Sequence, residues 1–473
     1  MTSKTGTDTV TAVWDRRSLV EQARVEELAL ADWLPGAATF APHWSGIVND
    51  LGLAPGDLVT RRELLRIPPS LQGQVAKSGG TRLVQRPTEN QVKAVASASL
   101  LLRIARGIGG DQRAGKRDLL LREFKSIHVT RGGAADQLAV ASSRADLDRQ
   151  HRIGARAASL LGLGDHDYLV SAVPAGPSAE FWSVHALAMG SSMLALHPRG
   201  HGQGLAGCLE AFGLMPTTAV ACLPDDAIAW AEALHEADQD VSRVVAVLLV
   251  GPPVGDETRA AIKAAWRTAG ALESELVVRS VWAPNVHRGI WTECLEGATG
   301  LHTMPDLEIL EVLDATTGQP TDGSGDLTVT SLGWTGTTLL RFRTGVEVGG
   351  LTTEACPACN RTVPRIVGPI TPGRWQPELD HAGTKTTLDL RAIAIEMQAS
   401  SVTAWRVELL CKGETETYVL ELGGKVTEAQ AREMAEKLRL ATGVAPGSVR
   451  LMQDASVVAA SVEAAGTPFS DVR

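Results

Sequence analysis

The sequence predicts an α/β protein with a large N-terminal domain and a small α+β C-terminal domain. Between residues 146 and 281, apolar segments typical of strands alternate with segments typical of helices. Such alternation over short connections produces a mostly parallel sheet that is covered on both faces. A stretch rich in proline and glycine follows Gly368, and the pattern changes after it. The 473 residues allow two to three domains.

Each element of the large domain, expected at residues 1–368, has a basis in the sequence. About the first 75 residues are typical of helices, with apolar residues from Leu19 to Leu30 near helical spacing. Residues 78–126 are irregular, contain a basic run and are interpreted as an insertion. We expect helices at 146–161, 181–189, 226–237 and 256–268, strands between them at 168–173, 193–196, 218–222, 244–250 and 276–281, and a strand-rich part at 307–313, 326–331 and 338–342.

The small domain is expected at residues 369–473. Its pattern predicts a helix at 388–397, a hairpin of strands at 405–411 and 417–422, a helix at 427–441 and a strand near 449–452. Thr427 stands where a helix cap is needed. This order is typical of a split βαβ module.

Composition and motifs exclude several classes of protein. The formal net charge is -9, which argues against a nucleic-acid binder or a protein of acidic membranes. No apolar stretch reaches the roughly 18 residues that a membrane span needs, and the first residues lack the apolar core of a signal peptide. The motifs of a hydrolase elbow, a P-loop and a Rossmann dinucleotide site are missing. We therefore expect a cytoplasmic protein with no nucleic-acid or membrane partner.

The segment from residue 318 to residue 366 carries an ordered set of motifs. Gly318-Gln-Pro is followed by Gly325-Asp-Leu-Thr-Val-Thr-Ser-Leu, by Leu340-Arg-Phe-Arg-Thr-Gly and by Cys356-Pro-Ala-Cys-Asn-Arg-Thr-Val-Pro-Arg-Ile. Glu293-Cys and Gly300-Leu-His lie upstream. This set resembles the phenylacetate–CoA ligase branch of the adenylate-forming superfamily. The resemblance covers most of the chain outside the insertion. It implies a large adenylate-forming N-terminal domain, a small mobile C-terminal domain and an active site between them.

Four residues are candidate ligands of a structural zinc ion. Cys356 and Cys359 are spaced so that one turn can present two thiolates to one ion. The resemblance extends to Cys294 and His302, which would complete a closed Cys₃His site. The alternative is a reduced cysteine pair with His302 on the surface. The other cysteines have apolar neighbours in the sequence and are expected to be buried thiols; they are Cys208, Cys222 and Cys411.

The loop that holds the ATP phosphates in the family is altered here. In the family it is rich in serine, threonine and glycine and carries a lysine, because a polyanion needs donors and positive charge. Residues 130–136 read Thr-Arg-Gly-Gly-Ala-Ala-Asp, so that Asp136 stands at the lysine position. Some anion binding remains open. The candidate cofactor-binding residues are Arg131, Gly132, Gly133 and Arg343.

Three further departures concern ATP. The segment matching the family's magnesium-binding glutamate has no acid between Glu275 and Glu293, and Val346 replaces the acid that holds the ribose. The last lysine is Lys437, and we expect no counterpart of the family's C-terminal lysine. Each contact of this kind contributes roughly 2–4 kcal/mol in a transition state. The sequence therefore predicts that ATP-dependent adenylation is lost or altered, and leaves ATP and Mg²⁺ in doubt as cofactors.

The acyl pocket of the family lies near two segments that hold aromatic and polar residues here. We expect an aryl or acyl carboxylate as the substrate; each tryptophan can instead be core and each histidine structural. Two other functions stay open: an active acid–CoA or acid–AMP ligase with unusual ATP contacts, and a non-catalytic partner of a carrier or pathway protein. Homodimerisation is also open. The candidate catalytic residues are His185, His287 and Arg288, and the candidate substrate-binding residues are Phe181, Trp182, Trp282, Asn285 and Trp291.

Overall fold

The computed structural model describes most of the chain between residues 15 and 472. The described ranges are 15–70, 81–95, 123–132, 138–198, 206–272, 276–284, 286–314, 318–372, 378–465 (with short gaps between 382 and 414) and 469–472. The chain forms two compact units. The larger contains the residues up to Ile370 except 133–137 and 345–347, and the smaller is made mainly of the residues from Thr371 onward.

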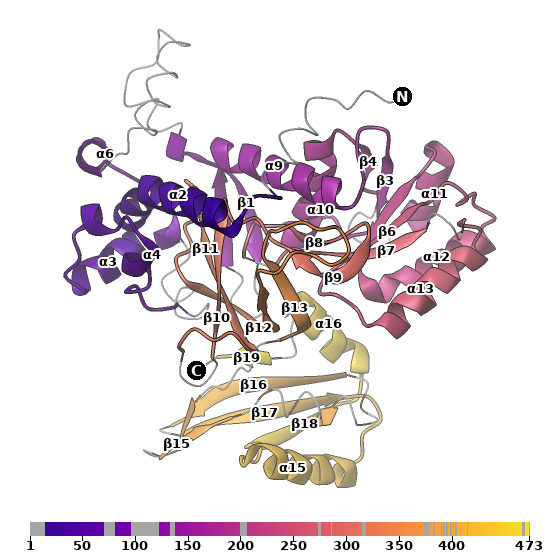
Figure 1. Ribbon diagram of the computed structural model, residues 1–473. Coiled ribbons are helices and arrows are strands. Elements are labelled where there is room, and N and C mark those ends of the chain that lie inside the picture. The colour runs from indigo at the N-terminus through magenta and orange to yellow at the C-terminus, as the bar shows by residue number, and fades with distance from the viewer. Residues whose placement is uncertain are drawn as a thin grey trace. The chain divides into compact units, whose positions relative to one another are not determined.

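An 11-stranded sheet organises the larger unit (Figure 1). Its parallel part has the order β4-β3-β5-β6-β7. These strands are β3 (Tyr168–Ser171), β4 (Leu194–Leu196), β5 (Ala219–Cys222), β6 (Ala246–Val250) and β7 (Val277–Trp282). The sheet continues from β7 through β8 (Trp291–Cys294), β9 (Gly297–His302), β13 (Arg365–Pro372), β12 (Phe342–Thr352), β11 (Gly325–Ser331) and β10 (Glu308–Leu313). The predicted parallel sheet with a strand-rich extension is confirmed.

Helices cover both faces of the parallel strands. Side chains alternate between the two faces of a strand. On one face, Leu169, Ala219 and Leu248 pack with α9 (Arg144–Leu160) and α10 (Ala179–Ser191). On the other face, neighbouring strand residues such as Val170 pack with the remaining helices, which are α11 (Ala206–Leu214), α12 (Ala227–Glu236) and α13 (Asp256–Thr268). The strands are apolar at successive positions because both faces are buried.

The N-terminal region is helical, but its buried stripe differs from the expected one. Its elements are α2 (Leu19–Phe40), α3 (Pro42–Asp50), a 3₁₀ turn (Pro55–Asp57), α4 (Arg61–Leu64), a second 3₁₀ turn (Thr81–Leu83) and α6 (Glu89–Val95). Ser18 and Glu21 form a capping box at the start of α2. Leu19 and Leu28 are exposed, whereas Leu30 and Trp33 are buried. The second half of α2, rather than its first turns, therefore faces the core.

Two more differences concern the strands and the insertion. The expected strand at 338–342 begins only at Phe342, because Arg341 has a positive φ of 44° and Thr337 instead forms an isolated bridge with Val84. Of the region 78–126, residues 78–80 and 96–122 lie outside the described residues, whereas Leu83 belongs to the buried core. A two-stranded sheet of β1 (Ser126–Gly132) and β2 (Leu138–Ser143) leads from this region into α9.

The smaller unit has its own sheet and core. The strands are β14 (Glu378–His381), β15 (Thr384–Thr387), β16 (Ala404–Lys412), β17 (Thr415–Gly423), β18 (Ser448–Met452) and β19 (Phe469–Asp471). The helices that lie wholly within the described residues are α15 (Glu428–Thr442) and α16 (Ala455–Ala465). The predicted hairpin is β16 and β17, and Thr427 caps α15. The expectation for Cys411 was wrong, since it is exposed on β16, where Val407 and Leu409 point to the core. No helix among the described residues is long and apolar enough to cross a membrane.

Candidate functional site

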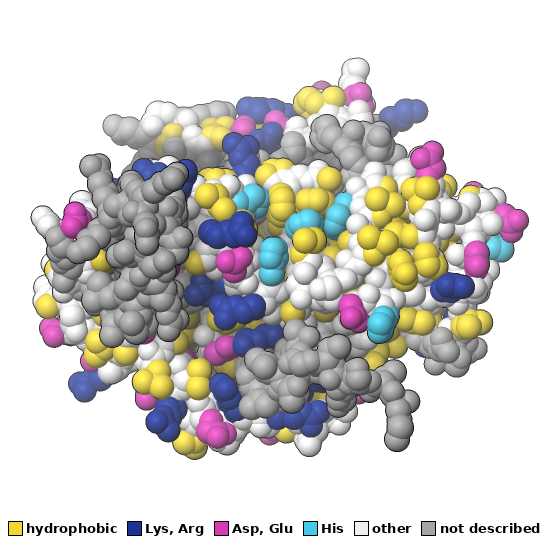
Figure 2. Space-filling model, turned by 90° about the horizontal axis from the view of Figure 1, so that it is seen from above, with side chains coloured by type: hydrophobic (Ala, Val, Ile, Leu, Met, Phe, Trp, Pro, Cys, Tyr) yellow, Lys and Arg dark blue, Asp and Glu magenta, His cyan; other side chains and the backbone are white. Residues whose placement is uncertain are grey.

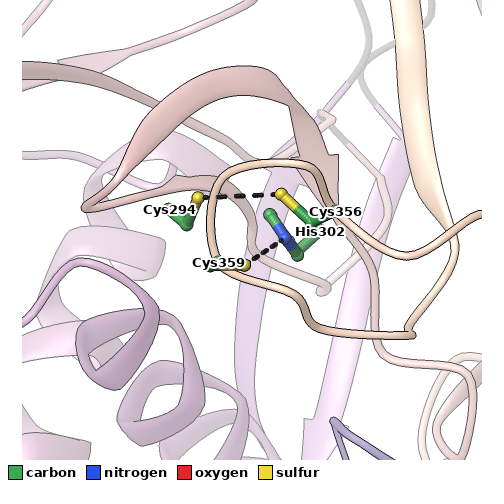
Figure 3. Close-up of side chains that lie close together, drawn as sticks. All are labelled: Cys294, His302, Cys356 and Cys359. Atoms are coloured by element: carbon green, nitrogen blue, oxygen red, sulfur yellow. Dashed lines mark hydrogen bonds between the residues drawn. The ribbon is translucent and has the colours of Figure 1, made fainter.

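A buried group of three cysteines and one histidine lies at the strand-rich end of the sheet. Cys294 ends β8, His302 ends β9, and Cys356 and Cys359 lie in the loop between β12 and β13. The pairing of β8 with β9 and of β9 with β13 brings these segments together. The four side chains point toward one another (Figure 3), and their ligand atoms all lie within 4.8 Å of one another. The structure thus assembles the four predicted ligands.

The hydrogen bonds around this group suit a metal ligand set. His302 Nδ1 lies 3.3 Å from the carbonyl oxygen of Thr292, which leaves Nε2, 3.3 Å from Cys359 Sγ, on the side of the thiols. A histidine ligand commonly donates its second ring N–H to a carbonyl in this way. The Cys294 and Cys356 sulfurs are 4.0 Å apart, far beyond a disulfide bond of about 2.05 Å. The donors therefore fit one soft, tetrahedral cation.

Hydrogen bonding divides the thiols into a donor and an acceptor. The hydrogen bond with Cys294 lowers the pKa of Cys359, and the same bond raises the pKa of Cys294. His302 and Arg361 also lower the pKa of Cys359. Arg361 in turn pairs with Asp15 at 2.7 Å. Negative charge is therefore favoured on the sulfur of Cys359 and disfavoured on that of Cys294, and a bound cation would favour the thiolate form that binds metal.

The second feature is the loop after β7, where the family has its aromatic residue and magnesium-binding glutamate. Trp282 is buried at the end of β7, and Asn285 lies outside the described residues. Val286 is 2% exposed and packs in the apolar core that contains α2. The described part of this loop therefore places an apolar side chain, and no carboxylate, at its centre.

Arg288 is buried against the start of α9. Its NH1 donates to the carbonyl oxygen of Ala141 at 3.0 Å and lies 3.4 Å from Asp146 Oδ2, and its NH2 donates to the carbonyl oxygen of Thr337. Its guanidinium lies over the ring of Trp334, 3.9 Å from the centroid. Burial lowers the pKa of Arg288 to about 10, so the side chain stays charged at neutral pH. The contacts of Arg288, a candidate catalytic residue, are therefore with other groups of the protein that hold it in place.

His287 is engaged in a second buried network. Its Nε2 lies 2.5 Å from Glu308 Oε2, and its Nδ1 lies 3.3 Å from Ser331 Oγ. Trp291 donates to the other oxygen of Glu308 at 2.7 Å. A side chain at Gly289 would place its Cβ 2.3 Å from His287 Nε2, so the network leaves room only for glycine at this position. Like Arg288, His287 is held by protein groups.

The third feature is a cluster of histidines and aromatic residues at the carboxyl edge of β3 and β4. Phe181, Trp182 and His185 lie on α10, which follows β3, and His197 directly follows β4. Ring centroids are 5.6 Å apart for His185 and His197 and 5.1 Å for Phe181 and His197. His128 from β1 packs edge-on against Trp182, with centroids 4.2 Å apart. Figure 2 shows histidines gathered beside apolar side chains on the face seen from above.

Burial favours the neutral form of the histidines in this cluster. Burial, and next the neighbouring His185, lower the pKa of His197 from 6.5 to about 4. Burial also lowers the pKa of His128 and of His185. Both ring nitrogens of His197 are buried and make no hydrogen bond with any described residue. Open sheets of this kind bind ligands at the carboxyl ends of their strands, which is where the cluster lies.

The predicted nucleotide-binding residues are only partly described. Arg131 and Gly132 end β1, and the backbone N–H of Arg131 donates to the carbonyl oxygen of Pro177 at 2.7 Å. Gly133 and Asp136 lie outside the described residues. Arg343 on β12 forms an ion pair with Asp326. Val346 also lies on β12, and Lys437 pairs with Glu433 at 2.9 Å on α15.

Sequence reasoning missed several residues of these features. His128 lies far from His185 in the sequence, and the position of β1 brings it close, whereas His197 follows β4, the next element after α10, and the pairing of β3 with β4 places it beside His185. Asp146 was predicted only as the first residue of a helix, although it receives hydrogen bonds from three backbone N–H groups, those of Ser143 at 3.0 Å, Thr335 at 2.8 Å and Gly336 at 2.7 Å. A signal for Asp146 was available, because Ser143 and Asp146 have the spacing of a capping box.

Two solved structures of similar fold are those of an acid–CoA ligase. One is 2-hydroxyisobutyryl-CoA ligase in an open conformation in complex with 2-HIB-AMP and CoA, with 17% identity and a TM-score of 0.60 over 92% of this chain and 89% of that chain. The same ligase in the postadenylation state in complex with 2-HIB-AMP has 16% identity and a TM-score of 0.60 over 95% and 93%. No protein-family model matches this chain, and no curated protein matches it.

These likenesses concern the fold, because the identities are low. The chain has the mixed α/β fold of the adenylate-forming acid–CoA ligases, with a large N-terminal part and a smaller C-terminal part. The predicted superfamily fold is thereby confirmed. The phenylacetate–CoA ligase branch stays a prediction.

Proposed function

We propose that this protein is a ligase-like protein that binds or transforms an aromatic or acyl carboxylate, and that its ATP-dependent adenylation is lost or altered. The observation that carries the proposal is the loop after β7. Val286 is buried there, and Arg288 is committed to Asp146 and to two backbone carbonyls. A loop fixed in this way offers no carboxylate from its described residues to a magnesium ion.

The cluster on α10 is the proposed substrate site. Phe181 and Trp182 supply apolar ring surface, and His185 and His197 supply uncharged ring nitrogens. Planar aromatic molecules bind such surfaces through stacking and edge contacts, and a few polar groups fix their orientation. His185 is the proposed general base or hydrogen-bonding partner of the substrate. His287 and Arg288 are proposed to support this edge of the sheet from below the surface.

We also propose that Cys294, His302, Cys356 and Cys359 hold a structural zinc ion. Three thiolates and one imidazole form a closed tetrahedral set, with no open position for water or substrate. Such an ion would tie the hairpin of β8 and β9 to the loop before β13. It would supply stability and take no part in the reaction.

An active ligase with unusual ATP contacts is the second candidate function. The fold supports this second candidate, because a ligase solved in complex with 2-HIB-AMP and CoA has a similar fold. The third candidate, a non-catalytic partner of a biosynthetic protein, makes no use of the histidine cluster. Cytoplasmic location, a carrier-protein partner and homodimerisation remain predictions.

Exchange of labelled pyrophosphate into ATP separates the first two functions. The exchange is measured across a panel of aryl and acyl acids, with an active acid–CoA ligase as the positive control. We expect none above background, together with binding of one acid class to the wild type. That binding should be lost in Trp182→Ala and weakened in His185→Gln, and unchanged in His166→Gln, whose side chain is 97% exposed. Clear acid-dependent exchange would establish the active ligase instead.

Metal analysis tests the zinc proposal. Protein purified without added metal should contain about one equivalent of zinc, and Cys356→Ser should lose most of it. Cys208→Ser is the matched control, because Cys208 is buried and belongs to the other face of the sheet. A zinc content below about half an equivalent, unchanged in Cys356→Ser, would rule the ion out.

A further inference from the structure

A cavity of about 180 Å³ lies between α2, α9 and the segments around residues 306 and 333. None of its lining residues belongs to the zinc group or to the histidine cluster. A cavity of about 150 Å³ is large enough to hold benzene. The space therefore suits a molecule with a single ring.

One wall of the cavity is aromatic and rigid. Trp33 and Phe40 extend from α2, and Phe124 packs edge-on against Phe40 with ring centroids 5.5 Å apart. The indole nitrogen of Trp33 donates to the carbonyl oxygen of Trp334 at 2.8 Å, so its polar atom is satisfied and its ring surface is left for packing. Burying a ring against this wall is favourable without moving its side chains.

The part of the lining that comes from α9 carries two arginines, which lie three residues apart and so on one face of the helix. Arg149 is largely buried, with 15% of its side chain exposed, and Arg152 is exposed at the rim. Of the two acids in the lining, Asp306 is already held by Arg156 through bonds of 2.7 and 2.9 Å. Asp32 lies on α2, so a bound anion is favoured on the α9 side. Guanidinium groups bind carboxylates through strong, charge-assisted hydrogen bonds.

The cavity is connected to the loop after β7 through one carboxylate. Arg149 lies 3.6 Å from Asp146 Oδ1, and Arg288 of the loop lies 3.4 Å from Oδ2 of the same residue. Thr335, which lines the cavity, donates its backbone N–H to Asp146 at 2.8 Å. A ligand in the cavity would therefore contact groups that fix the loop.

We infer that this cavity is a second binding site, for a small monocyclic carboxylate whose ring packs on Trp33 and Phe40 and whose carboxylate faces Arg149 and Arg152. The site goes beyond the proposed function, because it lies away from the histidine cluster and needs neither ATP nor the zinc ion. Its occupancy would stabilise the contacts between α2, α9 and the loop that carries Arg288.

Calorimetric titration of the full chain with benzoate tests the site, and benzamide serves as the uncharged probe of the same shape. We expect benzoate to bind more tightly than benzamide. Arg152→Gln should weaken benzoate binding about tenfold, because it removes a charge-assisted contact with the carboxylate. Ala29→Phe, which fills the cavity from α2, should abolish this binding. Arg144→Gln is the matched control, since Arg144 lies on the same helix with 76% of its side chain exposed.

The outcomes distinguish this site from the proposed substrate site. Benzoate binding that survives Trp182→Ala but is lost in Ala29→Phe supports the cavity, whatever happens at the histidine cluster. Binding that is unchanged in both Arg152→Gln and Ala29→Phe, or no binding by a wild-type chain that gives a normal unfolding transition, would overturn the inference. Benzamide binding as tightly as benzoate would overturn the assignment of the arginines.

Discussion

Asp146 connects three parts of the larger unit through hydrogen bonds to one buried carboxylate. It completes the capping box of α9, receives the backbone N–H groups of Thr335 and Gly336, and lies between Arg149 and Arg288. Its side chain is fully buried. Burial of a carboxylate is tolerated only when hydrogen bonds and positive charge compensate it, as they do here.

Replacing Asp146 should therefore destabilise the protein strongly. Asp146→Asn keeps the shape but leaves Arg288 buried without its counter-charge, and we expect a loss of about 3–5 kcal/mol in the free energy of unfolding. Urea denaturation followed by fluorescence measures this loss. Asp148→Asn on the same helix alters only an exposed pair and should stay within about 0.5 kcal/mol. Equal losses in the two variants would contradict the role given to Asp146.

His197 makes stability depend on pH. Its pKa falls from 6.5 to about 4 on folding, mainly through burial and next through His185. The unfolded chain therefore binds a proton more readily than the folded chain between these two values. The contribution of neutral His197 to the free energy of unfolding is fully present above pH 6.5 and is lost as the pH falls toward 4. We expect unfolding free energies measured from pH 7 to pH 4 to fall less steeply in His197→Gln than in the wild type. Parallel pH profiles would contradict this.

For single residues, the sequence predicted groupings that depend on local spacing better than contacts with distant parts of the chain. Cys356 and Cys359 were predictable because a two-residue spacing is a local property of one turn. His287 and Arg288 were predicted to line a pocket, but their partners Glu308 and Asp146 come from distant elements. No local pattern shows such pairings.

Two helices are held in close contact by small residues. A Cβ at Gly154 of α9 would lie 2.1 Å from the carbonyl oxygen of Ala186, and a Cβ at Gly190 of α10 would lie 2.0 Å from that of His151. Each contact is with backbone, which cannot rotate away. The position of α10, and with it His185, therefore depends on both glycines.

Gly190→Ala should push these helices apart. We expect a loss of about 1–3 kcal/mol, as for overpacked sites, and weaker binding at the histidine cluster. The matched control is Gly213→Ala in α11, where the new methyl group meets nothing within 4 Å; alanine there should be neutral or stabilising. Thermal melts of both variants give the comparison. A Gly190→Ala chain as stable as the Gly213→Ala chain would argue against tight packing.

Helices and strands could be predicted where the local spacing of apolar residues determines which side of the element is buried. The helix at 256–268 and the hairpin in the C-terminal part match α13 and the pair β16 and β17. The apolar stripe predicted for α2 was wrong, because burial of a helix face depends on which other elements pack against it. The core packs against the second half of α2 and leaves Leu19 and Leu28 exposed. The expected strand at 338–342 was also wrong. Leu339 and Leu340 are buried in the core, but the backbone bends at Arg341 and they form no paired strand.

The whole molecule contains separate hydrophobic cores. The smaller unit packs Leu409, Leu420 and Leu438 around its own sheet, and the larger unit has cores on both faces of its parallel strands. Units with independent cores commonly depart from two-state unfolding. The division of the chain at 368 was predicted from a change in composition, which is a property of the chain and needs no tertiary contact.

Calorimetry of the full chain should therefore resolve more than one transition. Leu438→Ala removes a fully buried side chain of the smaller unit and should cost about 2–5 kcal/mol there. Leu234→Ala is the matched change in the larger unit. We expect each substitution to lower the midpoint of a different transition. A single transition that both substitutions shift equally would mean that the molecule unfolds as one cooperative body.

The buried contacts of Val286 and Arg288 also limit how this protein can be re-engineered. Introducing glutamate at position 286 would place a carboxylate in an apolar core at a position that is 2% exposed. Moving Arg288 away would leave Asp146 without one of its two guanidinium partners. Installing a carboxylate for a magnesium ion in this loop would therefore need several coordinated substitutions, each harmful alone. Directed evolution by single steps should meet a barrier at this loop, and libraries that vary positions 146, 286 and 288 together are the more promising route.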